Sequence, residues 1–397
     1  MFFHAESLRA SVALSLLTLA AGCSSAGPDV PGSGYHPDPG DTTSSSGGSS
    51  TSSGSSGAGS SSSSSGAGSS GSSGATGGSS SGTTGGSSTG GGSSSSGGSG
   101  STISASTTWA DGQQIGSVTI ASGVTVTIAP GATVTVAAGS TITVAGTLSG
   151  TSATTHAILT GTGWTALTVA SGGSLALTAV DITGAATALQ TQAGAGTVEY
   201  DQGTITGATT PFDVAAGTTL GTKNATVTGT LGTSHVAGSL VASYLDYDSN
   251  GNEGIVTTDP TATESIEDSK LHGSGPVADM VVSAQGAASI HIAYTDITNV
   301  HCGFHFDALD ALDVSYSNVE TNAYGFMLYG SSGAGPRTIT YSNIDQNQIA
   351  FDTTPGVNGP ITFDHDYITG TQNPADAVSV TNAQTATVTG TGPRPQQ

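Results

Sequence analysis

The chain has very few cysteines and very few basic residues, and both shortages exclude whole classes of protein. Only two of its 397 residues are Cys, at positions 23 and 302, so a disulfide-stapled fold is excluded. Five Lys and Arg stand against 27 Asp and Glu, giving a formal net charge of −22. Nucleic acid, anionic lipid and polyanionic glycans are bound through basic surfaces, so the charge argues against all three as partners.

Long apolar runs are also missing, except for about ten residues from Val12 to Ala21 that follow Arg9. This run is too short to span a bilayer, and residues 1–22 read as a cleaved signal peptide. Leu19-Ala20-Ala21-Gly22-Cys23 resembles the lipobox of bacterial lipoproteins, although Ala20 stands where Leu is commonest. The resemblance implies lipid on the sulfur of Cys23; the alternative is an ordinary secretory signal. Ser24 is not the Asp of inner-membrane retention, so the outer membrane is implied, with the chain facing the periplasm or the cell surface.

Residues 23–101 are almost entirely Ser, Gly, Ala and Thr. Such a segment cannot bury enough apolar surface to offset the entropy of ordering, so we expect a disordered tether. A flexible coil of about 75 residues spans roughly 45–50 Å, which would hold the rest of the chain away from a membrane.

From Ser117 onward, β-branched residues alternate with Thr or Ala, and Gly recurs at short intervals. This pattern predicts short strands separated by turns, with no helix. Downstream, segments of one kind recur about every 23 residues, with the residue before the apolar position at 181, 204, 226, 246, 270, 296, 318, 343, 366 and 387. Three or four residues later each copy has Gly or Asn, the types that best tolerate left-handed backbone. Those residues are predicted to turn the corners: Gly184, Gly207, Gly229, Asn250, Gly273, Asn299, Asn322, Asn347, Gly370 and Gly390.

A period of this length, built from short strands, indicates a solenoid whose coils bury their inner faces against one another. The pattern W-x-x-L-x-V-x-x-G-G-S-L-x-L-x-x-V-x-I at residues 164–182 resembles right-handed parallel β-helix repeat proteins of the pectin-lyase-like superfamily. We therefore predict an all-β, right-handed parallel β-helix of about twelve coils over residues 102–390, with a disordered tail at 391–397. That fold carries lyases, hydrolases, adhesins and spacers, so it does not decide the activity.

The stretch Tyr244–Gly254 matches the start of a calcium-binding loop through Asp246, Asp248 and Asn250. A loop of that kind also needs a bidentate Glu at its twelfth position, where this chain has Thr257. The repeat frame by itself places these residues at a corner. The prediction is a turn, with Ca²⁺ binding as the alternative and no other cofactor.

Acidic residues are the remaining candidates for catalysis, because the Gly-His-Gly and Arg-Ile-Lys elements of the related polygalacturonases are missing. Three basic residues spread over the repeat region are too few for a lyase site that neutralises uronate. Two carboxylates about 5–10 Å apart would still support glycoside hydrolysis. The candidates are the expected same-face pair Asp364 and Asp366, together with Asp307 and Asp313. The competing interpretation makes all four solvated residues of an acidic solenoid.

His301, Cys302 and His305 form a second candidate cluster, since such side chains bind transition metals. The repeat register points Phe304 and Phe306 inward, which sends His305 and Asp307 toward solvent. A surface role for the histidines and a small buried role for Cys302 are favoured. The register also predicts contacts between coils, His291 with Asp313 and Lys270 with Asp296.

Tyr294, Tyr316 and Tyr341 recur at one position of the repeat, two residues before the aligned Asp or Asn. They are predicted to form a ladder of rings, either stacking on sugars or bracing the solenoid internally. The sequence as a whole favours a non-enzymatic envelope protein for adhesion, spacing or glycan contact, with neutral carbohydrate or another envelope protein as partner. A glycoside hydrolase acting through paired carboxylates is the alternative.

Overall fold

The computed structural model describes residues 100–396, apart from 153, 276–279, 287, 330–334, 354–360 and 375–377. The predicted signal peptide, Cys23 and nearly all of the predicted tether lie outside the described residues. Within them, the chain forms 36 short strands, and no helix in this part is long and apolar enough to cross a membrane.

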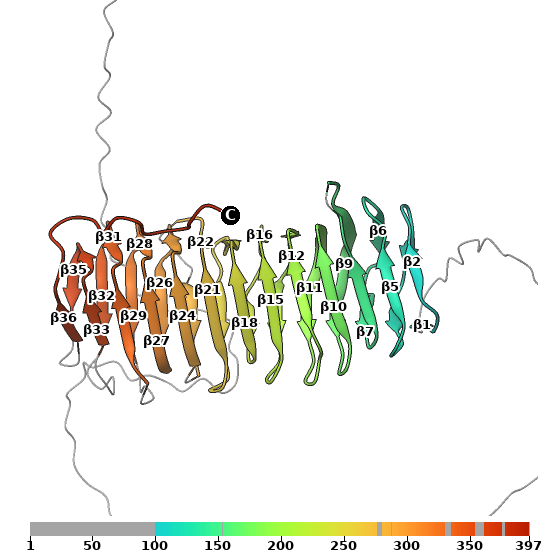
Figure 1. Ribbon diagram of the computed structural model, residues 1–397, viewed down its shortest axis with the longest axis horizontal. Helices are drawn as coiled ribbons and strands as arrows, with labels where there is room; N and C mark the ends of the chain where they lie inside the picture. Colours follow the sequence, from blue (N-terminus) through green and yellow to red (C-terminus); the bar gives the residue numbers. More distant parts are fainter. Residues whose placement is uncertain are drawn as a thin grey trace, which may run out of the picture. The chain divides into compact units, whose positions relative to one another are not determined.

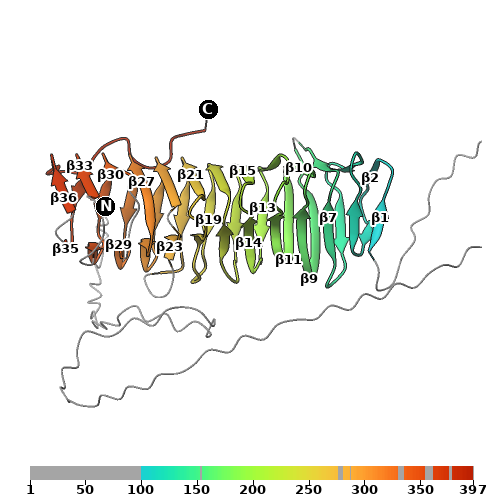
Figure 2. The same ribbon diagram turned by 90° about the horizontal axis from the view of Figure 1, so that it is seen from below.

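Each coil contributes strands to three ladders of parallel strands, which stack along the solenoid (Figures 1 and 2). Ladder A consists of β1 (Ser101–Ile103), β4 (Val118–Ile120), β7 (Thr141–Val144), β9 (Ala157–Val169), β11 (Val180–Thr191), β14 (Thr210–Val214), β17 (Ser234–Val236), β20 (Ile255–Thr257), β23 (Met280–Ala284), β26 (Cys302–Phe306), β29 (Tyr324–Leu328), β32 (Ile349–Thr353) and β35 (Thr371–Asn373). Ladder B consists of β3 (Gln114–Ile115), β6 (Thr133–Val136), the first parts of β9 and β11, β13 (Thr204–Thr206), β16 (Thr226–Thr228), β19 (Asp246–Asp248), β22 (Lys270–His272), β25 (Asp296–Thr298), β28 (Asn318–Glu320), β31 (Asn343–Asp345) and β34 (Tyr367–Ile368).

Ladder C is a separate sheet of 13 strands. It consists of β2 (Thr107–Trp109), β5 (Thr125–Ile128), β8 (Thr147–Gly150), β10 (Ser174–Thr178), β12 (Val198–Asp201), β15 (Thr219–Lys223), β18 (Ser239–Ser243), β21 (Thr263–Glu267), β24 (Ala288–Ala293), β27 (Leu309–Ser315), β30 (Arg337–Thr340), β33 (Ile361–Asp364) and β36 (Val378–Thr381). The predicted all-β parallel solenoid is confirmed, with about 11 turns where about twelve coils were predicted.

The core is built from apolar residues that occupy the same inward position in coil after coil. In ladder B they pair in register and are fully buried: Ile182, Ile205, Val227, Tyr247, Leu271, Ile297, Val319 and Ile344. Phe304 and Phe306 of β26 also point inward, as predicted. Because alternate residues of a strand face opposite sides, this in-register stacking sends the intervening polar residues outward.

The corner residues follow the prediction in some coils and depart from it in others. Asn250 and Asn299 take left-handed backbone, with φ of 50° and 57°. The predicted corner Gly273, however, does not take left-handed backbone. In two later coils the left-handed residues are Thr321 and Gln346, each one position before the predicted Asn. The prediction was wrong there because Asn322 and Asn347 turn their side chains into the solenoid, where both are buried.

The two buried Asn side chains bridge backbone groups of successive coils. The Asn347 side chain accepts from the Asn322 amide at 3.0 Å and donates to the Val319 carbonyl at 2.7 Å. Asn322 repeats this arrangement one coil earlier, accepting from the Val300 amide at 3.1 Å and donating to the Ile297 carbonyl at 3.1 Å. The two side chains therefore satisfy backbone groups that the corner would otherwise leave unpaired.

The last copy of the repeat, at residues 386–390, does not form a coil. After β36 the chain turns back, and residues 383–396, which we call the strap, run along the side of the solenoid toward its middle (Figure 1). The strap bonds to the Asp366 carbonyl, the Asn343 side chain and the Tyr316 carbonyl in turn. Residues 391–396, predicted to be part of a disordered tail, are thus held by hydrogen bonds that the local composition did not indicate.

Candidate functional site

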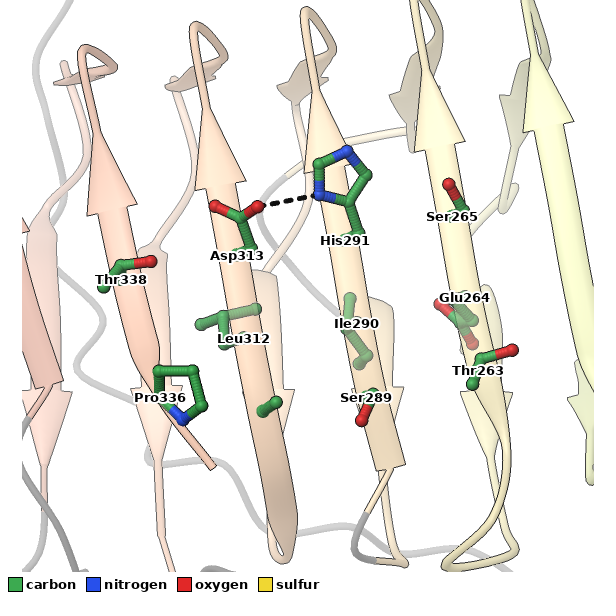
Figure 3. Close-up of a pocket in the computed structure, with 11 residues that line it drawn as sticks. Thr263, Glu264, Ser265, Ser289, Ile290, His291, Leu312, Asp313, Pro336 and Thr338 are labelled. Carbon is green, nitrogen blue, oxygen red and sulfur yellow. Dashed lines mark hydrogen bonds and ion pairs between the residues drawn. The ribbon is translucent and has the colours of Figure 1, made fainter. Parts of the chain in front are cut away.

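The outer face of ladder C is hollowed into a groove of about 470 Å³ over strands β21, β24, β27 and β30 (Figure 3). Apart from the inward Glu264, its polar lining comes from side chains at outward positions of consecutive coils: Thr263, Ser265, Ser289, His291, Asp313 and Thr338. Because the strands pair in register, these groups form rows that run along the solenoid. One such row is Ser265, His291, Asp313 and Thr338.

His291 and Asp313 are joined across neighbouring coils in this row. Nδ1 of His291 lies 2.9 Å from Oδ2 of Asp313, and Nε2 of the same ring lies 3.8 Å from Glu267 Oε1. The predicted cross-coil pair is therefore confirmed. Lys270 and Asp296 also face each other in register, as predicted. About half of the Asp313 side chain is exposed, so the groove presents hydrogen-bonding groups to solvent in a fixed order.

The three predicted tyrosines form a stacked column at the corner between ladders C and B. Ring centroids are 5.0 Å apart for Tyr294 and Tyr316, and 5.2 Å apart for Tyr316 and Tyr341, with planes within 6° of parallel. His365 extends the column at 4.9 Å from Tyr341. All four residues take left-handed backbone, which turns their rings out of the core. The predicted ladder exists, but it lies at the outer corner, and its ring faces cover one another.

Arg394 of the strap closes one end of this column. Its guanidinium carbon lies 3.8 Å above the centre of the Tyr294 ring, a cation–π contact. The same group forms two hydrogen bonds of 2.6 Å with the carboxylate of Asp268, which occupies the tyrosine position one coil earlier. These bonds hold the pKa of Asp268 below its usual value. Arg394 thus takes the place of the ring that this coil lacks.

Changing Arg394 to Ala is expected to release the strap while leaving the coils folded. Asp268, a buried residue, would lose its cation, and Tyr294 would lose the guanidinium over its ring. We expect amide hydrogen exchange at Gln384, Val388 and Gly392 to become about tenfold faster or more. Lys270→Ala, which removes an exposed cation elsewhere, is the control; equal exchange in both variants would contradict the role of Arg394.

Asp364 and Asp366 do not share a strand face, contrary to the prediction. Asp364 ends β33 and accepts hydrogen bonds from Thr381 at 2.7 Å and Asn382 at 2.8 Å, which lower its pKa. His365, with φ of 61°, then turns the corner, and Asp366 is buried. The comparison of repeat copies aligned Asp366 with Asn343, but ladder B pairs Asn343 with Tyr367. Asp366 therefore stands one position earlier in the repeat than expected.

Asp366 ends a buried row of hydroxyl groups that runs along this corner. The members of the row, one from each coil, are Ser269, Thr295, Ser317, Ser342 and Asp366. Each member's side chain accepts a hydrogen bond from the backbone amide at the same repeat position one coil earlier. The four hydroxyl groups also donate to the backbone carbonyl two residues before them. Burial raises the pKa of Asp366 to about 7. The interpretation of this residue as solvated was wrong.

Glu264 is a second buried carboxyl, which the sequence analysis did not single out. It occupies an inward position of β21, between Leu240 and Ile290 of the neighbouring coils. Neither of its carboxyl oxygens has a hydrogen-bond partner, and burial raises its pKa to about 8. A polar residue at an apolar position of the alternating segment Thr263–Glu267 was the only signal in the sequence.

The stretch with the calcium-loop spacing is a turn, and its polar groups bond within the protein. Asp246 bonds to His272 at 2.9 Å, which lowers the pKa of the carboxyl and raises that of the imidazole. Asp248 accepts from the Asn250 amide, and the Asn250 side chain donates to the Thr230 carbonyl. No group of three or more His, Cys, Asp and Glu side chains in the described residues is arranged to hold a metal.

The cluster around Cys302 is divided between two positions. Cys302 is buried, as predicted; its sulfur lies 3.2 Å from His301 Nδ1 and 2.8 Å from the Met327 sulfur. His305 lies further along β26, with 17% of its side chain exposed, and Asp307 Oδ1 is 3.5 Å from its Nε2. His305 is less exposed than predicted because it packs against the Tyr329 ring.

No family of known proteins, no curated protein and no solved structure matches this chain. The lipoprotein assignment therefore rests on the residues up to Cys23, and the solenoid on the repeat and the fold. Of the four catalytic candidates, Asp364 and Asp366 interact, because an Asp364 backbone hydrogen bond and the Asp364 charge both act on the Asp366 carboxyl. Asp313 pairs with His291, and Asp307 lies beside His305.

Proposed function

We propose that this protein is a lipid-anchored, non-enzymatic module of the bacterial outer membrane that contacts neutral polysaccharide through the ladder C groove. The lipid on Cys23 would hold it to the membrane, and residues 23–101 would act as the flexible tether. The observation that supports glycan contact is the row of outward polar groups, Ser265, His291, Asp313 and Thr338, in consecutive coils of one groove.

Such a row suits an extended polymer with many hydroxyl groups. Each coil places hydrogen-bond donors and acceptors at equivalent outward positions. A polysaccharide lying along the solenoid would therefore meet a similar set of groups at each successive coil. The parallel ladders hold these groups in place before binding, which lowers the entropy lost on association. The net charge of −22 disfavours polyanions and leaves neutral or cationic glycans.

The tyrosine column supports the groove rather than forming a platform for sugars. Tyr294 and Tyr316 directly follow β24 and β27, so the column borders the groove at the corner. Its ring faces cover one another, and stacking on a sugar needs an open face. The contribution of Tyr294, Tyr316 and Tyr341 to glycan contact would come from ring edges and hydroxyl groups.

Affinity electrophoresis through gels containing neutral polysaccharides tests the proposal. The double variant His291→Ala/Asp313→Ala is expected to lose most of the retardation of the unchanged protein, about tenfold in affinity or more, because it removes the hydrogen-bonded pair from the groove. His272→Ala/Asp246→Ala is the matched control, since it removes a pair with the same 2.9 Å spacing in ladder B. Equal effects of the two variants, or no retardation of the unchanged protein by any gel, would contradict the groove.

The same incubation separates binding from the alternative function, a glycoside hydrolase. New reducing ends that disappear in Asp313→Asn would show turnover through that carboxylate and would replace the binding module by an enzyme. Retardation without new reducing ends supports the proposal.

A further inference from the structure

The two ends of the solenoid expose strands that have a neighbour on one side only. Among the described residues, β35 and β36 pair with β32 and β33 alone, and β1 and β2 pair with β4 and β5 alone. The two pairs of end strands lie at opposite ends of the molecule (Figure 2). An unpaired edge of this kind is a template for another strand, and repeat proteins normally close it with a polar cap.

The terminal strands themselves lack the residues that normally prevent such pairing. Charged side chains and proline are the usual protection of an exposed edge. Both are missing from every terminal strand, whose sequences are STI, TTW and QI at one end and YI, TQN and VSVT at the other. This is notable in a chain with 27 acidic residues, because electrostatic repulsion between two ends is then weak.

One inward position at each end is open as well, although Trp109 of β2 is buried. Val380 pairs in register with the fully buried Phe363, yet 41% of it is exposed because no strand follows. At the other end, Thr107 is exposed although its register partner Val126 is fully buried. The strap could have covered the C-terminal end, but it leaves that end and binds along the side.

We propose that the protein associates head to tail with further copies of itself, with β1 and β2 of one copy extending ladders A and C beyond β35 and β36 of the next. The partner is a second copy because its N-terminal coil offers the same parallel strands that every internal coil offers its neighbour. A contact between two different surfaces does not close on itself, so it forms an open series of oligomers along the solenoid axis.

Sedimentation velocity over a range of concentrations tests this proposal on the chain from residue 23 onward, carrying Cys23→Ser to prevent lipid attachment. The unchanged solenoid is expected to form a concentration-dependent series of multiples of the monomer. Val380→Lys places a charge in the open inward position at one end, and Thr107→Lys does so at the other. Each variant alone is expected to be monomeric, with association weakened about tenfold or more, because a stacked coil would bury the unpaired charge.

An equimolar mixture of the two variants distinguishes this contact from any symmetric one. Each variant keeps one intact end, so the mixture is expected to form a dimer and nothing larger. Val241→Lys is the control, because Val241 is 47% exposed on the flank of β18 and lies at neither end; it should associate like the unchanged chain. A monomeric unchanged chain at all concentrations, a mixture without dimer, or a loss of association in Val241→Lys would overturn the proposal.

Discussion

Replacing Glu264 by Gln is expected to raise the free energy of unfolding at pH 8 by on the order of 4 kcal/mol, with little effect at pH 4. Glu264 is buried with no partner for either carboxyl oxygen, and its pKa in the folded protein is about 8. In the unfolded chain the same group titrates at about 4.3. A pKa raised by folding means that the folded state holds the proton more tightly.

The unfolding free energy of the unchanged protein should therefore fall as the pH rises from about 4.3 to about 8. Above about pH 8, ionisation of Glu264 should not lower it further. The amide of the Glu264→Gln variant has no proton to lose in this range, so this part of the decline should disappear. Urea unfolding between pH 4 and pH 9 measures both slopes, with Glu199→Gln, at an exposed position of β12, as the control. Parallel slopes in Glu264→Gln and the unchanged protein would show that Glu264 is not a buried, protonated acid.

Changing Asn347 to Ala is expected to destabilise the solenoid by about 2–5 kcal/mol, because it leaves two buried backbone groups without partners at about 1–3 kcal/mol each. The groups are the Asn322 amide and the Val319 carbonyl. Urea unfolding measures the loss, and hydrogen exchange of the Asn322 amide shows whether it arises at this corner.

Asn299 provides the comparison, because it also stands at a corner but turns the chain through its own backbone instead of bonding to buried backbone groups. Its side chain is exposed, and its backbone is left-handed. Asn299→Ala should therefore cost only the strain of placing Ala in that conformation, about 1–2 kcal/mol. Gln346→Gly should be neutral or stabilising, since Gln346 is the left-handed residue of its coil. A larger loss in Asn299→Ala than in Asn347→Ala would reverse the roles that the structure assigns.

Much of the candidate site follows from repeat spacing alone. Once the period is read, His291 and Asp313 must face each other, and Tyr294, Tyr316 and Tyr341 must align, because parallel strands stack equivalent positions. The spacing fails where one residue changes the register. Asp366 stands one position away from its expected place, and this single step moves its carboxyl from solvent into the buried hydroxyl row.

The sequence by itself determined the all-β parallel solenoid, its approximate coil number and its inward apolar positions, since alternation and period are local properties of the chain. Only the tertiary structure decided which corner residue turns left-handed and which Asn is buried, because packing against the neighbouring coils chooses between them. It also decided the path of the strap. Residues 386–390 match the repeat in sequence but belong to the strap. Arg394 of the strap contacts Asp268 and Tyr294, which lie about 100 residues or more earlier in the chain. No local sequence pattern encodes a contact between positions so far apart.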